Sequence, residues 1–166
     1  IKDGDCLGFS NGSLFEALGP QLKDKKDLGF HSLYFTDAMA ELVKNGAVTN
    51  SRKTPFRGKS LTSYAIGSKK LMKWLHRNPL VEFQGTDFVC NPIFIGKIPQ
   101  FVALYQAEKV DLIGGVAFPR TGSVISGPGE VVDFFQGAEA SEEGCTIIGL
   151  PSRNIKGTSN ILFSLM

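Results

Sequence analysis

The sequence has few of the residues that build metal centres and disulfide frameworks. It holds two histidines and three cysteines among 166 residues. Cys6, Cys90 and Cys145 stand far apart, form no CxxC pair and are odd in number. Structural zinc sites and disulfide-rich secreted folds need clustered or paired cysteines. We therefore expect no metal and no disulfide framework, and a reducing cytoplasm as the location.

An excess of charge of one sign and long apolar runs are also missing. The 18 basic and 16 acidic residues leave a net charge of +2, and residues 23–27 alternate in sign. A nucleic-acid-binding surface requires a marked cationic excess. No apolar run approaches the ~20 residues of a membrane helix, and no signal peptide is visible. We predict that the chain binds neither nucleic acid nor membrane.

The composition is that of a globular domain, with 42% hydrophobic and 20% charged residues. Strand and helix signals alternate along the chain, which is typical of an α/β layer fold. Strands are expected at residues 5–10, 28–35, 60–67, 100–107, 110–118, 145–152 and 156–165, and helices from Leu14 and over 38–45, 69–78 and 131–138. No repeat or internal boundary is visible, so residues 1–166 are predicted to form a single domain.

Two of these strands carry further expectations. CTIIGLPS is apolar throughout and is predicted to be a strand that a parallel sheet buries on both faces. VDLIGGVAF follows QFVALYQA at a distance that suits a hairpin, with Gly114 and Gly115 near its turn or bulge. The chain begins at Ile1 rather than Met and ends within a predicted strand. We expect it to be a domain of a longer protein.

Two glycine turns stand at strand-to-helix junctions. One is SGPG before the helix at 131–138, and the other is SNG after the first strand. Backbone N–H groups at a helix start can hold a phosphate or an oxyanion. Neither turn is a GxGxxG motif or a P-loop, so spacing alone favours plain tight turns. The residues that would line a shared crevice are Ser126, Gly127, Gly129, Asn11 and Gly12.

The segment LGFHSLYFTDAMAELVKNG joins a strand to a helix through polar residues. His31 and Ser32 are adjacent on the predicted strand and point to opposite faces, which argues against a Ser-His-Asp triad with Asp37. His31 is therefore expected to be buried and hydrogen-bonded. Asp133 is explained as a first-turn residue favoured by the helix dipole. Glu130 is harder to explain, because it would repel a phosphate bound at the SGPG turn.

The chain as a whole resembles the C-terminal half of the acetyl-CoA hydrolase/transferase family, which includes 4-hydroxybutyrate, butyryl and succinyl CoA-transferases. Six stretches match family segments in order: IKDGDCLGFSNGSLFEAL, KKDLGFHSLYFTDAMAELVKNGAVTNSRKT, NPLVEFQGTDFVCNP, EKVDLIGGV, SGPGEVVDFFQGA and LPSRNIKGT. The resemblance implies an open, mostly parallel sheet flanked by helices, of the CoA-transferase type. It also implies CoA or acyl-CoA as ligand and an N-terminal half-domain as partner, with a homodimer left open.

The family mechanism runs through a glutamate that attacks the thioester. The resulting anhydride is opened by CoA to a glutamyl-CoA thioester. In the family this glutamate follows a His-Ser pair, whereas here His31 and Ser32 are followed by Leu33. Where the family has a second glycine pair, this chain has Gly129 and then Glu130. Because leucine cannot form an anhydride, the candidates are attack by water or by a displaced carboxylate: Glu130, Asp37 and, less favoured, Glu41.

Two functions therefore remain open on the sequence. The first is acyl and CoA exchange between CoA thioesters and a carboxylate, with the glycine turns lining the CoA site. The second is a degenerate CoA-binding, regulatory or dimerisation domain without the nucleophile, a hypothesis that Leu33 favours. A sugar-phosphate isomerase-like domain ranks last, because only the fold supports it.

Overall fold

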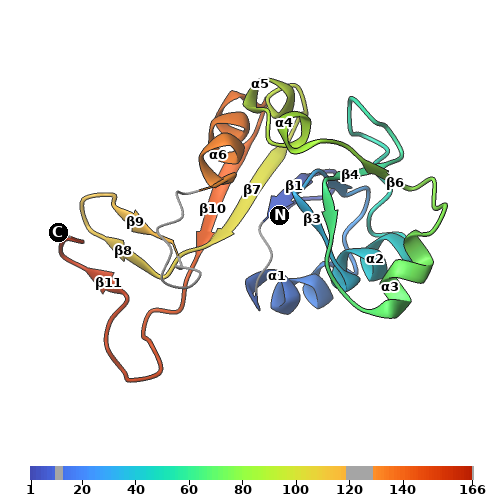
Figure 1. The fold of residues 1–166 in the computed structure, drawn as a ribbon. Coiled ribbons are helices and arrows are strands. Elements are labelled where there is room, and N and C mark those ends of the chain that lie inside the picture. Colours follow the sequence, from blue (N-terminus) through green and yellow to red (C-terminus); the bar gives the residue numbers. More distant parts are fainter. Residues whose placement is uncertain (10–12, 119–128, 166) are drawn as a thin grey trace.

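The central element of the fold is a parallel β-sheet. The computed structural model describes residues 1–9, 13–118 and 129–165. Four strands pair in parallel in the order β10-β7-β1-β2. They are β1 (Cys6–Phe9), β2 (Gly29–Phe30), β7 (Phe101–Gln106) and β10 (Cys145–Gly149) (Figure 1). The predicted mostly parallel α/β fold is confirmed.

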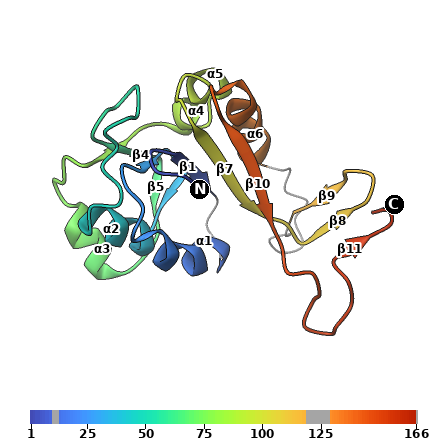
Figure 2. The same ribbon diagram turned by 180° about the vertical axis from the view of Figure 1, so that it is seen from behind.

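Three smaller sheets accompany it among the described residues. Strand β4 (Ser60–Thr62) pairs with β6 (Val81–Phe83), and β3 (Tyr34–Phe35) pairs with β5 (Tyr64–Ala65). The third sheet has the order β11-β8-β9, from β8 (Lys109–Asp111), β9 (Val116–Ala117) and β11 (Ile161–Leu162). It projects from the body of the fold, as the view from behind in Figure 2 also shows. The other two lie close to the central sheet, where a bridge between His31 and Leu61 joins β4 to the end of β2.

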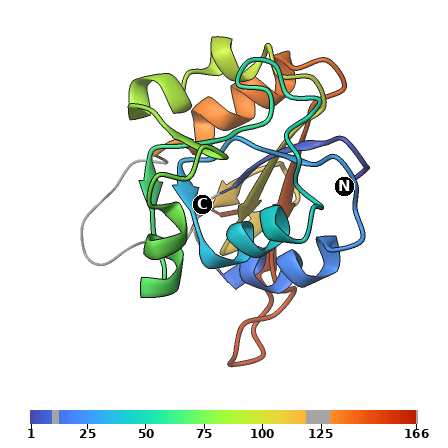
Figure 3. The ribbon, with the colours of Figure 1, turned by 90° about the vertical axis from the view of Figure 1, so that its right-hand side faces the viewer.

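Helices cover both faces of the central sheet. The described helices are α1 (Ser13–Leu18), the 3-10 helix η1 (Gly19–Leu22), α2 (Asp37–Lys44), α3 (Lys69–Leu75), α4 (Thr86–Val89), α5 (Pro92–Ile95) and α6 (Val131–Ala140). Figure 3 shows α1 and α2 below the strands and α5 and α6 above them. One core cluster includes Phe9, Phe30 and Met39, and the other includes Phe101 and Phe134.

The predicted helix boundaries are confirmed where capping chemistry marks them. Thr36 is the N-cap of α2, and Gly46 follows the helix with a positive φ of +84°. The hydroxyl of Ser68 accepts a hydrogen bond from the Leu71 N–H at 3.2 Å and caps α3. The α-helical hydrogen-bonding pattern of α1 ends before Pro20, and the chain continues as the 3-10 helix η1. Each of these signals acts within one turn of the residue that carries it.

The strand predicted over residues 28–35 is divided in two. The chain leaves β2 after Phe30 because its hydrogen bonds change partner there. The His31 N–H donates to the Leu7 carbonyl of β1, whereas the Ser32 N–H donates to the Leu61 carbonyl of β4. The strand predicted over 60–67 is divided in the same way between β4 and β5. Residues 31–33 therefore cross from one sheet to the next.

Two predictions about the later strands were wrong. Strand β10 is not buried on both faces: it lies at the edge of the sheet, its first three residues are exposed, and Ile147 is 37% exposed. The hairpin is not made with residues 100–107, since β7 pairs in parallel with β1 and β10. It forms within 109–117, between β8 and β9. The Asp111 carboxylate stabilises its turn by accepting a hydrogen bond from the Gly115 N–H at 2.6 Å.

In the ranges that the structure covers, no helix is long and apolar enough to span a lipid bilayer.

Candidate functional site

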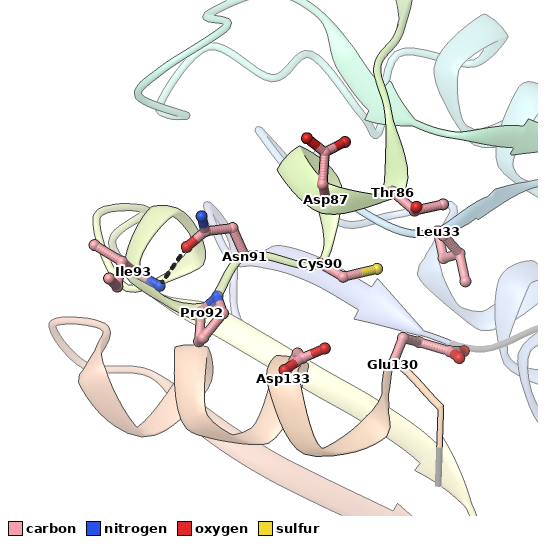
Figure 4. A pocket seen from close by; sticks show the side chains of 9 residues that line it. All are labelled: Leu33, Thr86, Asp87, Cys90, Asn91, Pro92, Ile93, Glu130 and Asp133. Carbon is pink, nitrogen blue, oxygen red and sulfur yellow. Dashed lines mark hydrogen bonds between the residues drawn. The ribbon is translucent and has the colours of Figure 1, made fainter. Parts of the chain in front are cut away.

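An open pocket of about 560 Å³ lies between three segments that are far apart in the sequence (Figure 4). Leu33 enters it from the crossing between β2 and β3. Asp87 and Cys90 enter from α4 and the residue that ends it. Glu130 and Asp133 enter from the first turn of α6. None of the described residues that line the pocket is a lysine, arginine or histidine.

The backbone of Leu33 is held firmly at the wall of this pocket. Its carbonyl accepts hydrogen bonds from the N–H groups of Ser63 at 3.1 Å and Tyr64 at 3.0 Å. The Thr62 hydroxyl donates a third bond to the same carbonyl at 3.1 Å. Leu33 is 7% exposed and lines one end of the pocket. Any side chain at this position would start from a fixed backbone.

His31 is a buried structural residue, as predicted. Its Nε2 donates to the Val89 carbonyl at 2.7 Å, because a carbonyl can only accept. Its ring packs near those of Phe94, Phe101 and Phe134. Burial, together with the nearby positive charge of Lys53, lowers the pKa of His31 to about 3. His31 is therefore neutral at physiological pH and supports the end of α4 rather than acting as a base.

Ser32 lies on the other side of the chain and does not meet His31. Its hydroxyl donates to the Phe9 carbonyl of β1 at 2.5 Å and is fully buried. Asp37, the third residue of the hypothetical triad, is the first residue of α2. Its two carboxylate oxygens accept bonds from the Ser68 N–H and hydroxyl, both at 2.7 Å. The structure therefore contains no Ser-His-Asp triad among these residues.

Glu130 is the half-buried N-cap residue of α6, and its carboxylate points toward the Leu33 end of the pocket (Figure 4). Asp133, one turn later, also turns into the pocket, while Asp87 points away from both. Burial foremost, and then the charge of Asp133, raise the pKa of Glu130 above its ordinary value. A poorly solvated carboxylate with a raised pKa is a stronger base and nucleophile than one in water.

Three further groups that the sequence did not single out surround Glu130. Burial, Glu130 and Asp133 raise the pKa of Cys90 to about 11, so this residue is a thiol at neutral pH. The Tyr105 hydroxyl is buried and has no hydrogen-bond partner among the described residues. Burial and the charge of Glu130 raise the pKa values of both Tyr105 and Tyr34. No motif marks these residues, because they come from separate elements.

Of the other candidates from the sequence, the two that the structure describes, Glu41 and Gly129, are not among the residues that line the pocket. Glu41 forms an ion pair with Lys44 at 2.8 Å on the surface of α2. Gly129 immediately precedes Glu130, is exposed and has a positive φ of +58°. The remaining candidates lie outside the described residues: Ser126, Gly127, Asn11 and Gly12. Of the displaced carboxylates considered, the structure brings Glu130 alone beside Leu33.

The Asp37→Ala variant is expected to lose stability and to keep any thioester chemistry. The substitution removes the carboxylate at the start of α2 that accepts hydrogen bonds from Ser68 at the start of α3. The free energy of unfolding should decrease by about 0.5–2 kcal/mol, which is typical of the loss of a helix cap. Urea denaturation of this variant, beside the exposed Glu41→Ala as a matched control, measures the cost. Loss of thiol release from acetyl-CoA at unchanged stability would contradict this structural role.

Comparison with known proteins agrees with the fold. The acetyl-CoA hydrolase/transferase C-terminal domain matches residues 67–166. The 4-hydroxybutyrate coenzyme A transferase of Clostridium kluyveri is 40% identical over 158 residues, which are 95% of this chain and 37% of that protein. RipA from Yersinia pestis superposes with a TM-score of 0.91 at 30% identity, covering 100% of this chain and 37% of that structure.

A second solved structure is that of a 4-hydroxybutyrate CoA-transferase from Porphyromonas gingivalis. It has a TM-score of 0.89 at 33% identity and covers 99% of this chain and 40% of that one. The chain thus spans little more than a third of the length of these relatives. Segments on both sides of residue 67 take part in the match, because the relatives are similar over nearly all of the chain. The chain belongs to the acetyl-CoA hydrolase/transferase family, whose C-terminal domain it matches.

Proposed function

We propose that the pocket beside Leu33 handles CoA thioesters and that the reaction is acyl and CoA exchange with a carboxylate. One observation carries the proposal. Leu33, the position that the family resemblance assigns to the reacting residue, lines the same pocket as the carboxylates of Glu130 and Asp133. Membership of the family, with CoA-transferases among the relatives, supports CoA thioesters as the substrate class.

The charges of the pocket restrict which part of CoA it would take. Glu130, Asp133 and Asp87 are acidic, and no described lining residue is cationic. A phosphate placed here would be repelled at close range. The pocket therefore suits the uncharged thioester and pantetheine end of the ligand. The phosphates would lie outside it, against another part of the protein.

We further propose a cytoplasmic protein in which an N-terminal half-domain covers the open side of this pocket and supplies the cations. The relatives' greater length is consistent with such a half-domain. A homodimer remains an alternative way to cover the pocket. Size-exclusion chromatography with light scattering on the full-length gene product separates the two arrangements.

Calorimetric titration of the full-length protein with acetyl-CoA tests the proposal. Binding in the micromolar to millimolar range is expected, and pantetheine, which lacks the nucleotide and its phosphates, should compete for the pocket. A Leu33→Trp variant, which would obstruct the pocket beside Glu130, should weaken binding. The absence of detectable heat at millimolar acetyl-CoA would contradict both CoA-based functions.

The second candidate function is CoA binding without chemistry, in a regulatory or dimerisation domain. The apolar side chain of Leu33 in the pocket favours it, since leucine cannot attack a thioester. Release of free thiol from acetyl-CoA discriminates between the two functions. Tight binding without thiol release or exchange would favour the non-catalytic domain.

A further inference from the structure

We propose that Glu130 is the nucleophile of this pocket and that it replaces a carboxylate at position 33 from the facing wall. The inference rests on the proposed function, because it needs a CoA thioester in the pocket. Glu130 and Leu33 line the same cavity, although one precedes α6 and the other follows β2. A carboxylate at position 130 would therefore reach the same ligand as one at position 33.

The other nucleophilic groups of the site are excluded by their surroundings. The Cys90 thiol stays protonated, since burial and the two nearby carboxylates disfavour a thiolate. Asp37 lies outside the pocket and accepts two hydrogen bonds from Ser68. Asp87 is exposed and points away from Glu130 (Figure 4). Asp133 shares the pocket, but it lies one helical turn farther from the Leu33 end.

The surroundings of Glu130 suit a reacting carboxylate. It is half-buried and carries no ion pair among the described residues, so its charge is poorly compensated. The unpartnered, fully buried hydroxyl of Tyr105 lies close enough for the Glu130 charge to act on it. A buried polar group without a partner is costly.

The proposed reaction proceeds in two displacements. A carboxylate oxygen of Glu130 attacks the thioester carbonyl carbon, and the carbon–sulfur bond breaks, which releases CoA thiolate and leaves an acyl-glutamyl anhydride. The thiolate then attacks Cδ, the carboxyl carbon of the Glu130 side chain. The bond from this carbon to the bridging oxygen breaks, which releases the acyl group as a carboxylate. A second carboxylate reverses these steps on the glutamyl-CoA thioester, so no oxidant, reductant or net proton is required.

Trapping with hydroxylamine tests this assignment on the full-length protein. After incubation with acetyl-CoA, hydroxylamine should convert Glu130 to a hydroxamate that peptide mass spectrometry locates. The Glu130→Gln variant should lose the hydroxamate and slow the exchange of labelled acetate into acetyl-CoA by at least about 100-fold. Its affinity for acetyl-CoA should change less than threefold. Glu139→Gln, an exposed site in the same helix, is the matched control and should behave as wild type.

The possible outcomes separate this inference from the function on which it rests. Exchange by Glu130→Gln at the wild-type rate, or a hydroxamate on another carboxylate, would overturn the assignment. Binding of acetyl-CoA by wild type without exchange or hydroxamate would overturn it and leave the pocket as a CoA site. If the wild-type protein does not bind acetyl-CoA, both the proposed function and the assignment of Glu130 are wrong. If Glu130→Gln does not fold, Glu130→Gly serves instead, because glycine is accepted at an N-cap.

Discussion

The double variant Leu33→Glu with Glu130→Gly is expected to form its covalent CoA adduct at position 33. The backbone of Leu33 is fixed by three hydrogen bonds to its carbonyl, and its side chain already lines the pocket. A glutamate there would carry its carboxylate into the cavity, and removal of Glu130 would relieve the repulsion between the two. Exchange of acetate into acetyl-CoA should exceed that of Glu130→Gln by at least about 100-fold.

The matched control for this experiment is Leu33→Gln with Glu130→Gly, which has the same shape without a carboxylate. It should bind acetyl-CoA and form no hydroxamate. The single variant Leu33→Glu should be less stable than the double variant, because it places another acidic side chain beside Glu130 and Asp133. A double variant that binds acetyl-CoA but gives no adduct at position 33 would show that this position does not face the thioester.

Acidification from pH 6.5 to 4.5 is expected to destabilise the fold by about 2–3 kcal/mol through His31 alone. The native state holds His31 neutral, since burial lowers its pKa to about 3. In the unfolded chain the pKa returns to about 6.5. The unfolded state therefore binds more protons than the native state between these two pKa values. The free energy of unfolding decreases as the pH is lowered through this window, and the decrease levels off near pH 3.

Denaturant unfolding at a series of pH values measures this effect. Between pH 6.5 and 4.5 the carboxylates with lowered pKa values, such as Asp27 and Asp111, remain ionised in the native state and contribute little. His31→Gln cannot titrate and should flatten the pH dependence, although it is less stable at pH 7. His76→Gln, at an exposed position, should leave the slope unchanged. An equal slope in wild type and His31→Gln would rule out His31 as the cause.

The sequence by itself determined the features that depend on near neighbours along the chain. Capping residues such as Thr36 and Ser68 predicted where helices begin, and Gly46 predicted where α2 ends. Alternating strand and helix signals predicted the α/β class, and the order of segments predicted the family. Burial of His31 also followed from its apolar neighbours. These signals act over a few residues, so pattern alone can detect them.

The tertiary structure alone decided the composition of the pocket and the burial of the strands. The apolar run of β10 does not distinguish an edge strand from a central one, and the structure places it at the edge. Asp37 was a candidate for the displaced carboxylate on the sequence, but in the folded chain it accepts two hydrogen bonds from Ser68. Leu33 and Glu130 meet because α6 packs against the sheet beside the crossing at residues 31–33. Contacts between residues so distant in sequence leave no local pattern, and for that reason the pocket could be recognised only in the folded chain.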